Sequence, residues 1–186
     1  MNDKVYTIGE NTPPAVAVCG SSIIKDPSVE RISFEVGFEI ASRGWILVCG
    51  GMGGVMEAAC RGVRSAREEK GASGLAVGIL PGQEFKSANP YCDVVIPTGL
   101  GLARNVVVVK SGNAVIIING SSGTLSEASF AWQYGLPLVV METTGGWAEK
   151  LAAMVKIDER ERAPILKAVT AEDAVALIGH EFGLGG

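Results

Sequence analysis

Two glycine-rich turns contain the residues of this chain whose types and spacing are best suited to chemistry. The first turn is segment 50–54 (GGMGG), and the second is segment 120–124 (GSSGT). Each follows a short apolar run and precedes a segment with helical spacing. At such a turn, free backbone N–H groups and the positive end of the helix dipole face one point and attract an anion. Two such turns in one small chain indicate a phosphate-bearing ligand held between strand ends.

Arg104 and Glu127 are the charged residues best placed to act beside these turns. The planar guanidinium of arginine matches a phosphate or a carboxylate, and Glu127 can act as an acid or a base where the second helix begins. Each motif also has a plainer interpretation. Arg104 can be a surface or ion-pair residue, and Thr124 with Glu127 can form a capping box with Thr124 as the N-cap. The first glycines can serve only to permit a tight turn.

Short apolar runs that alternate with segments of helical spacing must position these residues. The expected strands are residues 15–19, 45–49, 75–80, 93–96, 114–118, 138–141 and 165–169. The expected helices are residues 27–43, 55–70, 100–111, 124–134, 147–155 and 171–178, and residues 83–91 are expected as a loop. The apolar runs are continuous, which is typical of strands covered on both faces. The sequence therefore predicts an α/β fold, a Rossmann-like parallel sheet of about six or seven strands with helices on both faces.

Residues 100–111 allow two interpretations. The run Val106–Val109 is β-branched and suits a strand. A strand there would require a hairpin in a chain that otherwise alternates strand and helix. Because tertiary context often overrides intrinsic propensity, a buried helix is the favoured interpretation.

In such a sheet, ligands bind beyond the carboxyl ends of the strands. The glycines and polar side chains at those ends form the predicted ligand site. They are Gly20, Ser21, Ser22, Gly50, Gly51, Met52, Gly53, Gly54, Thr98, Gly99, Arg104, Asn105, Asn119, Gly120, Ser121, Ser122, Gly123, Thr124 and Glu127.

Length and composition limit the alternatives. The 186 residues fit one domain, with residues 1–12 as a flexible lead and 13–186 as a single Rossmann-like domain. A net charge of −4 without a Lys/Arg run disfavours a nucleic-acid polymer as partner. The chain has no long apolar run and no signal-peptide core, so we expect no membrane partner and a cytoplasmic location. With four cysteines that form no C-x-x-C pair and one histidine, His180, we expect reduced structural thiols and no metal site.

Two common nucleotide-binding signatures are absent. The first turn is not a G-x-G-x-x-G after the first strand, which disfavours a dinucleotide site. It is also not a G-x-x-x-x-G-K-[ST] sequence, which disfavours a P-loop NTPase.

The two turns nevertheless resemble paired motifs of the LONELY GUY superfamily. Segment 50–56 is similar to its G-G-G-x-x-G-L-M turn, and segment 120–127 to its P-G-G-x-G-T-x-x-E motif, with Arg104 where that superfamily has an arginine. Characterised members hydrolyse the N-glycosidic bond of nucleoside 5′-monophosphates to a free base and ribose 5-phosphate. The resemblance implies Arg104 and Glu127 as the catalytic pair. A carboxylate suits this chemistry because it can stabilise an oxocarbenium-like sugar or activate water.

The chain departs from the enzyme motifs at three positions. Asn119 replaces the motif proline, Ser121 its second glycine, and Asn105 the usual lysine. Residues 49–62 and 103–105 look closer to the branch with molybdenum-cofactor carrier proteins, which bind a phosphorylated pterin without turnover. We therefore expect a binding protein for a phosphate-bearing nucleotide-like ligand, with molybdenum cofactor as a carried ligand and no required cofactor. The alternative is a nucleoside 5′-monophosphate phosphoribohydrolase.

The resemblance bears on two further points. Members of the superfamily are dimers or larger, so we expect a homodimer or higher homo-oligomer with the helix at 104–111 as an interface element. Related chains often carry the label lysine decarboxylase. Nothing in these motifs resembles a pyridoxal-phosphate lysine site, so we reject that activity.

Overall fold

A computed structural model describes residues 12–154, 156–159 and 165–184. Its sheet has seven strands in the order β4-β3-β2-β1-β5-β6-β7, and every neighbouring pair is parallel. The strands are β1 (Ala15–Gly20), β2 (Ile46–Cys49), β3 (Leu75–Leu80), β4 (Val94–Pro97), β5 (Ala114–Ile118), β6 (Leu138–Met141) and β7 (Ile165–Ala168). The predicted Rossmann-like parallel sheet is confirmed. The predicted lead at residues 1–12 lies almost wholly outside the described residues.

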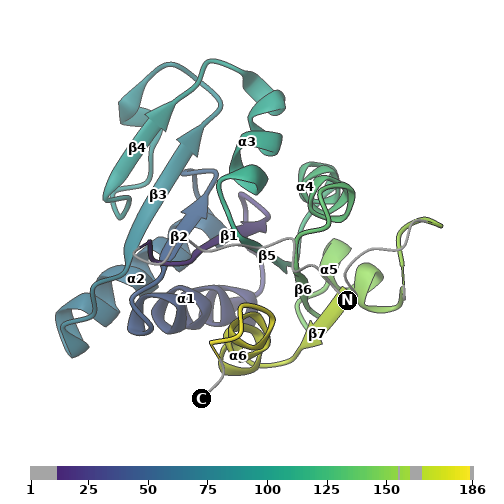
Figure 1. Ribbon diagram of the computed structural model, residues 1–186. Helices are drawn as coiled ribbons and strands as arrows, with labels where there is room; N and C mark the ends of the chain where they lie inside the picture. The colour runs from purple at the N-terminus through teal and green to yellow at the C-terminus, as the bar shows by residue number, and fades with distance from the viewer. Residues whose placement is uncertain (1–11, 155, 160–164, 185–186) are drawn as a thin grey trace.

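Six α-helices cover the two faces of this sheet (Figure 1). They are α1 (Pro27–Ser42), α2 (Val55–Lys70), α3 (Arg104–Lys110), α4 (Ser122–Gln133), α5 (Gly146–Ala152) and α6 (Ala171–Glu181). Helices α1, α2 and α6 pack on one face, and α3, α4 and α5 pack on the other. No helix within the described ranges is long and apolar enough to cross a membrane.

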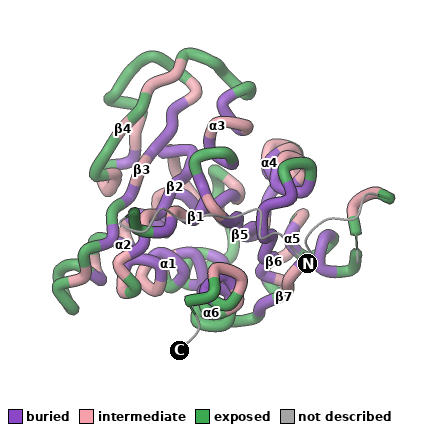
Figure 2. Tube along the Cα trace, in the orientation of Figure 1, coloured by how far each residue is buried: buried purple, intermediate pink, exposed green. Residues whose placement is uncertain are grey.

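The continuous apolar runs follow from this double cover. Along β1, Val18 packs into the core under α1 and α2, whereas its neighbour Cys19 packs into the core on the α4 side. In β5, Ile116 packs into the first of these cores and Ile117 into the second, and both are fully buried. The central strands are accordingly buried along their length, as Figure 2 shows.

The segment 100–111 forms a helix, as favoured. A short 3-10 turn, η2 (Gly101–Ala103), leads into α3, which buries Val108 and Val109 against the sheet. The β-branched residues are therefore covered by packing, which outweighs their strand propensity. The expected loop at 83–91 contains a second 3-10 turn, η1 (Phe85–Ser87).

The start of α4 differs from the predicted start, and the difference affects the candidate site. Helix α4 begins at Ser122 with Ser121 as its N-cap, so the capping box with Thr124 as N-cap is wrong. Thr124 is already in the first turn, and Glu127 lies further along the helix with its side chain directed toward Arg104. The helix expected at 147–155 ends at Ala152, and Val155 lies outside the described residues.

Candidate functional site

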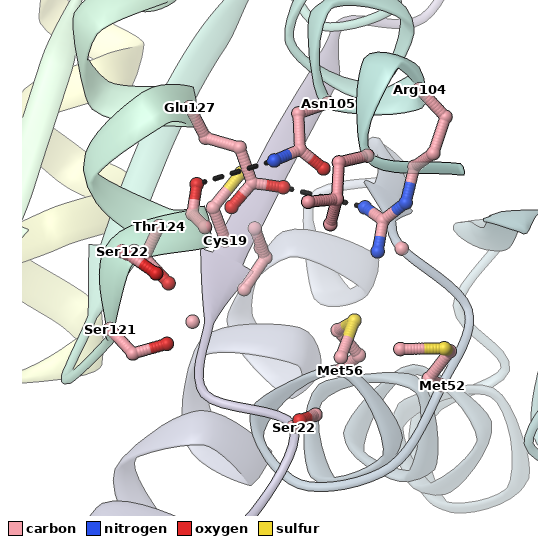
Figure 3. A pocket seen from close by; sticks show the side chains of 15 residues that line it. Cys19, Ser22, Met52, Met56, Arg104, Asn105, Ser121, Ser122, Thr124 and Glu127 are labelled. Carbon is pink, nitrogen blue, oxygen red and sulfur yellow. Dashed lines mark hydrogen bonds and ion pairs between the residues drawn. The ribbon is translucent and has the colours of Figure 1, made fainter. Parts of the chain in front are cut away.

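The sheet has a topological switch between β1 and β5. The chain moves outward from β1 to β4 on one side and from β5 to β7 on the other. Ligands of open α/β sheets bind at such a switch, beyond the carboxyl ends of the strands. A cavity of about 240 Å³ lies there (Figure 3). It is lined by Val18, Cys19, Gly20, Ser22, Gly50, Met52, Met56, Leu102, Arg104, Asn105, Ser121, Ser122, Gly123, Thr124 and Glu127.

Arg104 forms one wall of the cavity. It is the first residue of α3 and only 7% exposed, and its guanidinium lies directly over Gly50. A Cβ at Gly50 would lie 2.4 Å from Arg104 Nη2, so any side chain at this position would displace the guanidinium. Arg104 Nε is buried and has no hydrogen-bond partner among the described residues. The first glycine turn thus holds a buried arginine that still has a donor to offer.

Glu127 faces Arg104 from α4. Its Oε1 lies 3.4 Å from Arg104 Nη1, and both side chains are buried (Figure 3). Because this separation is longer than the usual 2.7–2.9 Å of a charge-assisted bond, the pair leaves donor and acceptor capacity for a ligand. Burial raises the pKa of Glu127 to about 7, against the opposing effect of the Arg104 guanidinium. Near neutral pH the carboxyl group can therefore give or take a proton.

Cys19 is a site residue that our sequence reasoning missed. It lies near the end of β1 and lines the cavity together with Glu127. Burial, and then the negative charge of Glu127, raise the pKa of the Cys19 thiol well above its ordinary value. The sequence feature that could have identified Cys19 as a site residue is its position immediately before Gly20, at the end of a buried strand. Val18, Met56 and Leu102 were missed as well, since apolar residues carry no chemical signature in a sequence.

The start of α4 opens onto the cavity. The first hydrogen bond of this helix is donated by Leu125 N to Ser121 O, at 3.0 Å. The N–H groups of Ser122, Gly123 and Thr124 precede that bond, so they have no acceptor within the helix. The Ser121 side chain makes no capping hydrogen bond either. These groups and the helix dipole form an anion site of the kind expected from the second turn.

Asn119 does not line the cavity but fixes the turn that leads to α4. Its φ is +54°, and its side-chain amide donates to Thr144 O at 2.6 Å. Its backbone N–H donates to Thr144 Oγ1 at 2.8 Å, and its Oδ1 accepts from Ser21 Oγ at 2.8 Å. Proline has no N–H group and is confined to a φ near −65°. The replacement of the motif proline thus gives the second turn a different backbone here.

The Asn105 side chain is hydrogen-bonded to residues in the first turns of α4. Its Nδ2 donates to Ser126 Oγ at 2.8 Å and lies 3.3 Å from Gly123 O. It therefore ties α3 to α4 and brings no charge to the cavity.

The remaining predicted residues do not line the cavity. They are Ser21, Gly51, Gly53, Gly54, Thr98, Gly99, Asn119 and Gly120. The start of α2 differs from that of α4, because its first N–H, from Val55, donates to Ser21 O at 2.9 Å. Thr98 Oγ1 donates to Leu80 O at 2.7 Å and closes the turn after β4. At the start of α4, by contrast, none of the N–H groups of Ser122, Gly123 and Thr124 has an acceptor among the described residues.

Comparison with known proteins agrees with this architecture. The chain is 29% identical over 158 residues to the cytokinin riboside 5′-monophosphate phosphoribohydrolase of Mycobacterium tuberculosis, which spans 78% of each chain. The molybdenum cofactor binding protein from Rippkaea orientalis superposes with a TM-score of 0.78 and 29% identity, covering 92% of this chain and 98% of that one. The molybdenum cofactor carrier protein from Chlamydomonas reinhardtii superposes with a TM-score of 0.77 and 27% identity, covering 92% of this chain and 99% of that one.

The family assignment rests on most of the chain. Residues 13–175, from β1 into α6, match the SLOG cluster4 family. Together with the paired turns, Arg104 and Glu127, this places the chain in the superfamily that the motifs resembled. The chain belongs to the SLOG cluster4 family, within the superfamily of LONELY GUY enzymes and molybdenum-cofactor carriers.

Proposed function

We propose that this protein binds a phosphate-bearing, nucleotide-like small molecule in the cavity between β1 and β5. The observation that carries the proposal is the open start of α4 beside a buried arginine. The N–H groups of Ser122, Gly123 and Thr124 and the guanidinium of Arg104 border the same cavity. A phosphate that accepts hydrogen bonds from them would satisfy donors that have no partner among the described residues.

The cavity also indicates where the rest of the ligand lies. Its volume of about 240 Å³ is below the roughly 300–1,000 Å³ of pockets that enclose a whole ligand. We therefore place the phosphate and the adjoining atoms inside and the ring at the mouth. Met52, Met56 and Leu102 line the cavity, and Leu102 is 83% exposed. These flexible apolar side chains can cover the face of a purine or a pterin.

Within this class of ligand, we propose a carrier role for a phosphorylated pterin such as molybdenum cofactor. Its support is the similarity to the two molybdenum-cofactor proteins and the departures from the enzyme motifs at Asn119, Ser121 and Asn105. Each of these residues has a polar side chain that is neutral, and Asn105 is bound to α4. In this role Arg104 and the start of α4 would hold the phosphate, and no bond would be broken.

The second candidate is hydrolysis of a nucleoside 5′-monophosphate, and the Arg104–Glu127 pair favours it. A carboxyl group with a pKa of about 7 is poised for proton transfer at neutral pH. Glu127 would activate water or stabilise the cationic sugar as the N-glycosidic bond breaks, and Arg104 would hold the phosphate. The similarity to the phosphoribohydrolase supports the same reaction.

One experiment separates the two roles. Calorimetry measures binding of AMP and of a phosphorylated pterin, and chromatography measures free adenine released from AMP. Saturable pterin binding without release of adenine supports the carrier and excludes the hydrolase for this substrate. Adenine release that is lost in Glu127→Gln, but kept in the exposed-site control Glu68→Gln, establishes the hydrolase. Binding of neither compound contradicts the proposed site.

We further propose that the protein is a homo-oligomer. In the structure, the apolar residues Val108 and Val109 of α3 are buried within one chain, and Val106 and Val107 are partly exposed. The edge strand β4 is a better candidate, because Val94 and Ile96 are each 44% exposed and Leu100 is 52% exposed. Light scattering tests this proposal. We expect a dimer or larger species that Ile96→Lys dissociates, and a monomeric wild type would refute it.

A further inference from the structure

Three cysteine side chains meet beneath the first glycine turn, outside the proposed ligand site. They come from separate elements: Cys49 ends β2, Cys60 lies in α2, and Cys92 precedes β4. The Sγ atoms of Cys49 and Cys60 are 3.6 Å apart, and those of Cys60 and Cys92 are 3.9 Å apart. Within the described ranges, no group of His, Cys, Asp and Glu side chains is arranged as a metal site. The chemistry that three touching thiols can perform without a metal is oxidation to a disulfide.

The three thiols differ in access to solvent. Cys49 and Cys60 are buried, whereas Cys92 is half-buried at the surface. The neighbouring thiols of Cys49 and then Cys60 lower the pKa of Cys92 below its ordinary value. A thiol that is both accessible and easily ionised is the one an oxidant attacks. Cys60 is the neighbour whose sulfur already lies 3.9 Å from it.

The segment that carries Cys92 is bonded directly to the first glycine turn. Asn89 N donates to Gly51 O at 2.8 Å, and Asn89 Nδ2 donates to Met52 O at 3.1 Å. The same amide lies 3.8 Å from Cys60 Sγ, and Asn89 Oδ1 accepts from Tyr91 N at 3.1 Å. Met52 in turn lines the cavity. Asn89 therefore connects the segment of Cys92 to Met52 in the cavity wall, and a movement of Cys92 toward Cys60 would be passed on through this one residue.

We propose that Cys92 and Cys60 form a reversible disulfide on reaction with a peroxide, and that this bond shifts the first glycine turn and weakens ligand binding. The Cys92 thiolate attacks one oxygen of hydrogen peroxide, the O–O bond breaks, and a sulfenic acid and hydroxide form. The Cys60 sulfur then attacks the sulfenic sulfur, the S–O bond breaks, and the S–S bond forms. The leaving hydroxide takes the Cys60 proton. Two thiols are oxidised and one peroxide is reduced to two waters, and an external dithiol reverses the step.

The geometry explains why the bond would alter the turn. A disulfide requires an S–S distance of about 2.05 Å, so the Cys60 and Cys92 sulfurs must approach by nearly 2 Å from their separation of 3.9 Å. Cys60 sits on a long helix that is packed on the sheet, so the segment before β4 is the part that must move. That movement would disturb the contacts of Asn89 with Gly51 and Met52. The effect on binding rests on the proposed function, whereas formation of the disulfide does not.

Mass spectrometry tests the disulfide directly. Peroxide treatment of the reduced full chain should lower its mass by about 2 Da and protect two thiols from alkylation, with a peptide joining Cys60 to Cys92. Cys92→Ser and Cys60→Ser should each prevent this product, whereas Cys49→Ser, the matched control within the cluster, should retain it. Thermal unfolding of each variant checks that it is folded. A disulfide with another partner, or no loss of mass in wild type, overturns the proposal.

Calorimetry with AMP and with a phosphorylated pterin tests the effect on the cavity. We expect the oxidised protein to bind the tighter of the two about 10-fold more weakly, within the usual range of coupling between sites, and a dithiol to restore binding. Equal affinity of the reduced and oxidised forms overturns the coupling. If the reduced protein binds neither probe, the proposed function fails for both, and the mass spectra still decide whether the disulfide forms.

Discussion

Replacing Gly50 by alanine should displace the Arg104 guanidinium and weaken ligand binding. The added Cβ would lie 2.4, 2.5 and 2.7 Å from three guanidinium atoms, whereas ordinary contact begins at 3.4 Å. The guanidinium must therefore move by about 1 Å, which a flexible side chain can do without unfolding the protein. A shift of that size breaks a hydrogen bond between a charged donor and a phosphate. Such a bond contributes about 1.5–3 kcal/mol, so we expect binding to weaken by about 10- to 150-fold.

The chain provides a matched control for this substitution. A Cβ at Gly82 would meet nothing within 4 Å, and the φ of that residue does not favour glycine. Calorimetry should therefore show wild-type affinity for Gly82→Ala, while Gly50→Ala approaches the affinity of Arg104→Ala. Unfolding in urea should show all three variants folded. Wild-type affinity in Gly50→Ala, with binding lost in Arg104→Ala, would refute the idea that Gly50 positions the arginine.

Three further predictions concern stability, and urea unfolding measures each. The pKa of Glu127 is raised from 4.5 to about 7 on folding, so the folded protein holds the proton more tightly and stability should fall as pH rises from about 4.5 to 7, by at most roughly 3 kcal/mol. Glu127→Gln should abolish that fall, and a wild type equally stable at pH 5 and pH 8 would contradict it. Asn119→Pro should destabilise the fold by about 3 kcal/mol or more, because φ is +54° and the N–H is hydrogen-bonded, and a wild-type midpoint would be evidence against this backbone. Ser121→Ala should cost little because its side chain makes no cap, whereas Thr170→Ala should cost about 1 kcal/mol because Thr170 Oγ1 accepts from Asp173 N. An equal loss of unfolding free energy in Ser121→Ala and Thr170→Ala would contradict the assigned caps.

The sheet could be predicted from the sequence because its strands leave a distinct pattern. Strands covered on both faces must be apolar throughout, and segments such as 75–80 and 138–141 meet this requirement without interruption. The glycine turns between strand and helix mark the carboxyl ends of the strands. The helix at α3 followed from the alternation of elements and not from its valines, whose propensity points the other way.

The site was only partly predictable, because several residues act through contacts between distant segments. That Gly50 lies under Arg104, and that Asn119 bonds to Thr144, depends on the folded arrangement. The two turns look alike in sequence, yet the loop after β1 takes up one N–H group at the start of α2, that of Val55, through Ser21 O. Nothing in the spacing of residues 21 and 55 predicts that hydrogen bond.

The position of a bound phosphate tests the central claim most directly. A crystal structure of the protein with AMP or a phosphorylated pterin would give that position. We expect the phosphate oxygens to accept hydrogen bonds from the N–H groups of Ser122, Gly123 and Thr124 and from the Arg104 guanidinium, at about 2.7–3.2 Å. A phosphate bound at the start of α2, or anywhere outside the cavity between β1 and β5, would contradict the proposed site.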